Sequence, residues 1–123
     1  MLLNLTNHPV RHWSAEQLRC AIQRWGTVRD LPFPQVDPLW KEREILQTAH
    51  HLVRTVHKLH PDAVLCQGEL TLTLTVVSLL QRSGIPVYAA TSNRQVTELS
   101  QPDGSLQKRV VYRFVSFRRY PSS

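Results

Sequence analysis

Short apolar runs alternate with amphipathic segments along the first ninety residues of this sequence, and this alternation restricts the fold more than any other feature. Apolar runs at Leu2–Leu5, Thr27–Leu31, Asp62–Cys66 and Val87–Ala90 are typical of buried strands. Strands separated by helices form a mostly parallel sheet, because each crossover returns the chain in the same direction. We therefore predict an α/β, Rossmann-like fold with helices on both faces of the sheet.

Capping residues indicate where two of the helices begin and end. Ser14 is a natural N-cap, Gln17 follows three residues later as in a capping box, and Gly26 suits the helix end. Asp37–Pro38 is predicted to open the longest helix, with proline at its first position, and His60–Pro61 to end it.

The segment Leu70–Ser83 fits two structures. Its "LTLTLTVV" run alternates with a period of two and is rich in β-branched residues, which favours a strand. The same segment also carries an apolar stripe at helical spacing, and Gly84 follows it as a helix stop. We expect a helix, because a helix continues the alternation of strands and helices.

The C-terminal third is typical of a β-hairpin at one edge of the sheet. Gln95–Leu99 and Leu106–Tyr120 form its arms around the turn residues Pro102–Gly104. Strict alternation along the second arm would place Arg113 and Arg119 on one face of the hairpin.

Length and composition limit the function classes. The 123 residues, 41% of them hydrophobic, suffice for one domain spanning 1–123 without a separate effector domain. No apolar run approaches the ~20 residues of a membrane helix, and the N-terminus lacks a signal-peptide pattern, so we expect a cytoplasmic protein.

Cys20 and Cys66 are expected to be buried free thiols, and no Cys/His spacing indicates a metal. Gly-rich dinucleotide and triphosphate motifs are missing as well, so we expect no cofactor.

The charge favours an anionic partner. The net charge is +6, and 12 of the 15 basic residues are arginine, which binds phosphate in a bidentate manner.

Polar residues follow each predicted strand. Ligands of an open parallel sheet bind outside the carboxyl ends of its strands, so these residues are candidates for one site. They are Thr6, Asn7 and His8 after the first strand, Asp30 after the second, Gln67, Gly68 and Glu69 after the third, and Thr91, Ser92, Asn93 and Arg94 after the fourth. Turn and cap roles remain open for several, notably for Glu69 in the first turn of a helix. Arg94 near a helix N-terminus suits an anion best.

Two of these loops, "NLTNHP" and "ATSNR", together with the short Rossmann-like architecture, resemble the CRISPR-associated Rossmann fold (CARF) domains. The resemblance implies a homodimer that binds a cyclic oligoadenylate. We expect no membrane and no duplex DNA among the partners. Some members cleave the ring without a metal: the ribose 2′-hydroxyl attacks the neighbouring phosphate and leaves a 2′,3′-cyclic phosphate.

The resemblance also suggests roles for individual residues. Ser92 and Arg94 would stabilise the phosphate charge, and His8 and Glu69 would be the acid/base candidates. Adenine could stack on Phe33 or on an arginine plane.

Two other functions stay open. The same edge of the sheet would suit an enzyme or binding protein for another small anionic ligand. Alternatively, the basic and aromatic stretch "KRVVYRFVSFRRY" would suit single-stranded RNA.

Overall fold

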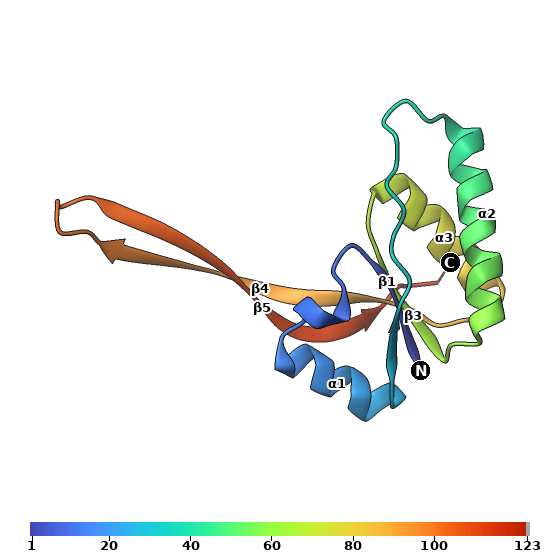
Figure 1. The fold of residues 1–123 in the computed structure, drawn as a ribbon, viewed down its shortest axis with the longest axis horizontal. Coiled ribbons are helices and arrows are strands. Elements are labelled where there is room, and N and C mark those ends of the chain that lie inside the picture. Colours follow the sequence, from blue (N-terminus) through green and yellow to red (C-terminus); the bar gives the residue numbers. More distant parts are fainter. Residues whose placement is uncertain (123) are drawn as a thin grey trace.

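The computed structural model describes residues 1–122 and contains one five-stranded sheet in the order β2-β1-β3-β4-β5 (Figure 1). β1, β2, β3 and β4 run parallel, and β5 pairs with β4 in the antiparallel direction. The strands are β1 (Leu2–Thr6), β2 (Val28–Asp30), β3 (Ala63–Gln67), β4 (Val87–Ser100) and β5 (Leu106–Arg119). The helices are α1 (Ala15–Trp25), α2 (Glu42–Leu59) and α3 (Leu70–Arg82). The predicted Rossmann-like α/β class is confirmed.

Helices cover both faces of the sheet, because successive residues of the two central strands point to opposite sides. All of β1 is buried, as is Ala63–Cys66 of β3. Leu3 and Leu5 pack with residues of α2 and α3, whereas Leu2 and Tyr88 pack on the α1 side. Burial of every β1 residue, the polar Asn4 and Thr6 included, reflects this cover on both faces.

The helical assignment of the ambiguous segment is confirmed, since Leu70–Arg82 forms α3. The predicted Ser14 cap is confirmed too: its Oγ accepts a hydrogen bond from the Gln17 backbone N–H at 3.1 Å.

The predicted start of the longest helix is wrong. Asp37 instead organises a turn, accepting the Leu39 N–H on its side chain at 2.8 Å and the Trp40 N–H on its carbonyl at 3.0 Å. The helix begins only at Glu42, after Lys41, whose N–H donates to the Glu44 carboxylate at 2.7 Å. The turn places Trp40 against the core, and this packing outweighs the local helix signal.

The expected fourth strand end does not exist. β4 continues through Thr91–Arg94 to Ser100, so it is itself the first arm of the hairpin and no separate strand covers Gln95–Leu99. The pairing with β5 satisfies the backbone on one side along this whole length, so polar side chains do not end the strand. The hairpin therefore projects from the body as a long two-stranded arm (Figure 1).

A β-bulge at the base of the arm changes which residues share a face. Thr91 pairs with Ser116 but Ser92 pairs with Phe114, so β5 carries one extra residue. Phe114 and Phe117 consequently lie on the same side, with ring centroids 4.9 Å apart. The predicted shared face of Arg113 and Arg119 is therefore wrong.

Only one cysteine behaves as expected. Cys66 is buried between the sheet and α2–α3, and burial raises the pKa of its thiol to about 12. Cys20 is exposed, because it lies on the solvent side of α1.

Within residues 1–122, none of the helices has both the length and the apolar character needed to cross a bilayer.

Candidate functional site

A buried polar network holds the loop after β1. Asn4 is 1% exposed, and its amide nitrogen donates to Asp30 Oδ1 at 2.8 Å and to the His8 carbonyl at 2.9 Å. Thr6 Oγ1 donates to Asn4 Oδ1 at 2.8 Å and accepts the His8 N–H at 3.1 Å. Asn4, Thr6 and Asp30 are therefore structural residues, and the Thr6 hydroxyl has little capacity left for a ligand.

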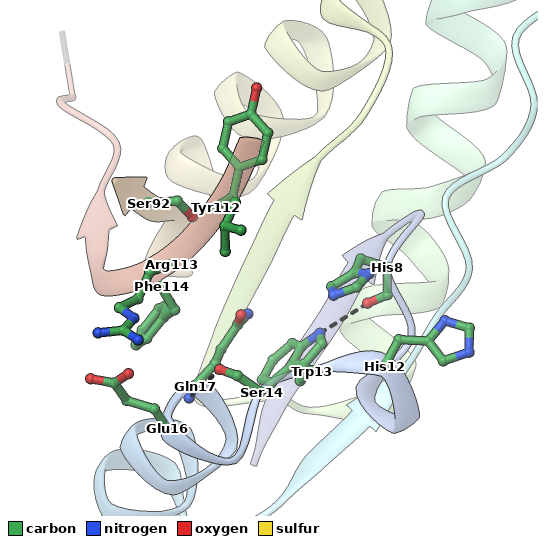
Figure 2. Close-up of a pocket in the computed structure, with 11 residues that line it drawn as sticks. His8, His12, Trp13, Ser14, Glu16, Gln17, Ser92, Tyr112, Arg113 and Phe114 are labelled. Atoms are coloured by element: carbon green, nitrogen blue, oxygen red, sulfur yellow. Dashed lines mark hydrogen bonds between the residues drawn. The ribbon is translucent and has the colours of Figure 1, made fainter. Parts of the chain in front are cut away.

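The same network fixes the backbone of His8 while leaving its ring exposed. The indole N–H of Trp13 donates to the His8 carbonyl at 2.9 Å, in addition to the Asn4 bond (Figure 2). Asp30 also accepts the Val10 N–H at 3.1 Å. A histidine side chain on a loop held this firmly is presented to ligands at a defined place.

Two adjoining pockets lie at the carboxyl ends of β1 and β3 and share His8 and Gln17; together we call them the edge cradle. The inner pocket measures about 380 Å³ and is lined by Thr6, Asn7, His8, Gln17, Leu65, Gln67 and Gly68. The outer pocket, about 580 Å³, lies between α1 and the base of the arm. Its lining is His8, His12, Trp13, Ser14, Glu16, Gln17, Ser92, Val111, Tyr112, Arg113 and Phe114. These volumes are typical of small-ligand sites.

Gln17 is the most informative residue of the cradle. The residue as a whole is 9% exposed, and within residues 1–122 its side-chain amide makes no hydrogen bond to the protein and remains open to the cradle. In Figure 2 it extends from the first turn of α1 into the space between Trp13 and Phe114. An amide that lines both pockets and has no protein partner is free to bond a molecule in the cradle. Here the amide can both donate to and accept from a ligand.

The outer wall of the cradle supplies charge and aromatic surface. Arg113 and Tyr112 come from β5, and Glu16 comes from α1 on the opposite wall (Figure 2). The N-terminus of α1 also lies here and favours negative charge. The cradle can therefore hold a ligand that carries phosphate together with hydrogen-bonding ring groups.

Gln67 and Gly68 form the floor of the cradle. The Gln67 side-chain oxygen accepts the Ala90 N–H at 2.8 Å, so this side chain extends the β3–β4 pairing. A Cβ on Gly68 would lie 2.5 Å from the Phe33 ring, so only glycine fits. Phe33 itself is 5% exposed, so its faces are not free to stack with a base.

Glu69 is a helix cap. Its carboxylate accepts the N–H groups of Leu72 at 2.8 Å and Thr71 at 3.0 Å, and also the Thr71 hydroxyl. These bonds hold the pKa of Glu69 below its usual value, and the bond from the Leu72 N–H has the largest effect. The carboxylate is thus ionised at neutral pH and already engaged, although Glu69 shares a pocket with Asn7.

The predicted residues of β4 separate from one another. Only Ser92 lines the cradle. Thr91 lies at the bulge, where its hydroxyl accepts a hydrogen bond from the Ser116 N–H at 3.1 Å. Asn93 and Arg94 line neither pocket of the cradle, although their cross-strand partners Arg113 and Tyr112 line the outer one.

Sequence reasoning missed Gln17, Tyr112 and Arg113 as site residues. Gln17 was assigned to the capping box, but the structure contains only the half of that motif in which Ser14 is the acceptor. Tyr112 and Arg113 reach the cradle because the hairpin returns past α1, and no local pattern encodes that return.

Chemically, the cradle offers amide, imidazole, guanidinium and hydroxyl groups. Within residues 1–122 there is no cluster of three or more His, Cys, Asp or Glu side chains that could hold a metal ion.

No curated protein matches the chain. A family model does match it over residues 1–118, and the chain therefore belongs to the Uncharacterized protein MJ1673 family.

Proposed function

We propose that this protein binds a cyclic oligoadenylate in the edge cradle. The observation that carries the proposal is the Gln17 amide, which has no hydrogen-bond partner within residues 1–122 and lines a pocket that also contains His8 and Arg113. A glutamine amide can recognise adenine with two hydrogen bonds. Its oxygen accepts from the N6 amino group of the base, and its nitrogen donates to N7 of the base. Under this proposal the protein acts in the cytoplasm, the compartment expected from the sequence.

The phosphates of such a ring would meet the positive end of the cradle. The N-terminus of α1 and Arg113 provide partial and full positive charge, and the chain carries a net charge of +6. Tyr112 is 68% exposed and offers a free aromatic face for stacking at the rim. Arg94 lines neither pocket although its cross-strand partner Tyr112 does, so the proposal assigns the phosphate contact within one subunit to Arg113.

Ring cleavage would use His8. The ribose 2′-oxygen forms a bond to the adjacent phosphorus, the bond from phosphorus to the 5′-oxygen breaks, and the 2′-hydroxyl proton ends on the 5′-oxygen. An imidazole can carry out both proton transfers, and the fixed His8 backbone would keep it in position. Glu69 is a weaker candidate, because its oxygens are committed to the cap of α3.

The test mixes the protein with labelled cyclic tetra-adenylate or hexa-adenylate in EDTA and follows gel mobility and product formation. We expect binding, and Gln17→Leu to weaken it by about tenfold or more, because one base-reading contact contributes ~1–3 kcal/mol. Gln23→Leu is the matched control, since Gln23 lies exposed on the same helix and outside the cradle. His8→Ala should bind but release no 2′,3′-cyclic phosphate product.

Two results would count against the proposal. If neither ring binds while nucleotides or sugar phosphates raise the melting temperature, the site holds another anionic ligand. If rings bind equally well to the Gln17→Leu and wild-type proteins, the ligand binds elsewhere.

A further inference from the structure

The outer edge of β4 is unpaired along the arm. β3 pairs with β4 only at Val87 and Tyr88, and the Gln67 side chain then takes the Ala90 N–H. Beyond Ala90, no other strand of the described chain lies on this edge, so Ser92–Ser100 has a partner on the β5 side only.

The direction of each backbone group on this edge follows from the hydrogen bonds at both ends of β4. The Ala90 N–H points toward β3, whereas the Val87 carbonyl and the Gln101 N–H are bonded on the β5 side. Because these directions alternate along a strand, the even-numbered residues turn their N–H and C=O groups to the free edge. They are Ser92, Arg94, Val96, Glu98 and Ser100.

The arm also exposes apolar side chains. Val96 is 47% exposed and its cross-strand neighbour Val110 is 43% exposed, and Val111, Leu99 and Leu106 are similarly open. A two-stranded ribbon with both faces in water is marginally stable, and an open strand edge attracts further strands. These features together indicate an additional strand that covers the β4 edge.

We infer that this additional strand is β4 of a second copy of the chain. An antiparallel pair centred on Val96 places Arg94 opposite Glu98 of the partner subunit, and symmetry repeats the pair. The same register places Ser92 opposite the partner's Ser100. It pairs even-numbered residues of the two chains, whose backbone N–H and C=O groups face the seam, the line along which the two β4 strands would meet. A shift of the centre by one residue in either direction removes both charge pairs.

The neighbouring strand strengthens this register. Glu98 already faces Lys108 of β5, and Arg94 faces Tyr112. Across the joined arms, Glu98 would lie between Lys108 of its own chain and Arg94 of the partner subunit. The Val96–Val110 pair would meet its own copy and form a continuous apolar row.

Charge selects the β4 edge over the β5 edge. Between Ser92 and Ser100 the only charged residues are Arg94 and Glu98, so β4 is neutral and self-complementary. Cations crowd β5 instead, including Lys108, Arg109 and Arg113, and two copies of that edge would repel each other. This inference concerns the arm and does not depend on the ligand of the edge cradle.

The first test measures mass by light scattering across the micromolar range, without nucleotide. We expect a dimer for the wild-type protein and a monomer for Val96→Pro, because proline removes an N–H that faces the seam. Val110→Pro is the matched control: it removes the outward N–H of β5 from the same cross-strand pair and should remain dimeric. A monomeric wild-type protein, or equal effects of the two prolines, would overturn the inference. A monomer that shifts only when single-stranded RNA is added would assign the arm to RNA instead.

Charge variants test the register without changing the backbone. Arg94→Glu and Glu98→Arg each place like charges opposite each other in the homodimer, and each should weaken dimerisation by about tenfold. An equimolar mixture of the two variants restores opposite charges at both pairs and should form a heterodimer. Single variants that dimerise like wild type, or a mixture that stays monomeric, would overturn the register.

Discussion

Gln17→Leu should stabilise the ligand-free protein although it alters a buried residue. The residue is 9% exposed and its amide makes no hydrogen bond within the described chain, so folding reduces the contact of the amide with water and provides no protein partner instead. An unpaired buried polar group costs about 1–3 kcal/mol, and leucine has a similar volume without that cost. Because part of the amide still faces the open cradle, we expect a gain near the lower limit.

A gain of about 1 kcal/mol corresponds to a rise of ~4 °C in melting temperature for a domain of this size. Urea denaturation and thermal melts would measure both quantities, with Gln23→Leu as the exposed control on α1. Loss of more than about 1 kcal/mol in Gln17→Leu would refute the reasoning, because it would mean that the amide has a partner. Gained stability together with lost ligand binding would identify Gln17 as a residue retained for function.

Other substitutions test the floor of the cradle and the core. Gly68→Ala should cost about 1–3 kcal/mol in urea denaturation, because its Cβ would meet the Phe33 ring at 2.5 Å, and Phe33→Leu should recover part of the loss. Glu69→Ala should lower stability at neutral pH. Since the folded-state pKa of Glu69 is lowered, the stabilisation is complete above the unfolded pKa and disappears as the pH falls through the folded one, so wild type and variant should converge in acid. Cys20 should react quickly with a thiol reagent while Cys66 reacts only on unfolding, because Cys66 is buried and its pKa is raised to about 12. Equal reaction rates would contradict the placement of Cys66 in the core.

Local signals were sufficient where one element decides its own structure. The Ser14 cap and the helix over residues 70–82 follow from capping chemistry and from the alternation of strands and helices. The loop after β1 was also found correctly, because polar residues directly after a buried strand must lie at the edge of the sheet.

Local signals failed where a distant segment changes the outcome. The polar run Thr91–Arg94 looked like a strand end, but pairing with β5 carries β4 through it. Asp37 looked like a helix cap, but packing of Trp40 delays the helix to Glu42. The Gln17 side chain could not be recognised as free, because whether an amide has a partner depends on residues that only the fold brings near.

The sequence by itself determined the α/β class, the order of its central elements and the polar character of the carboxyl edge, since these depend on periodicity and on residues close in the chain. Only the tertiary structure decided which of those polar residues are engaged. Thr6 bonds the Asn4 side chain, Gln67 accepts the Ala90 N–H of β4, and Glu69 accepts the Thr71 N–H of α3. The tertiary structure also decided that the hairpin becomes a projecting arm with a free edge on β4, because strand pairing is set by long-range contacts and not by local propensity.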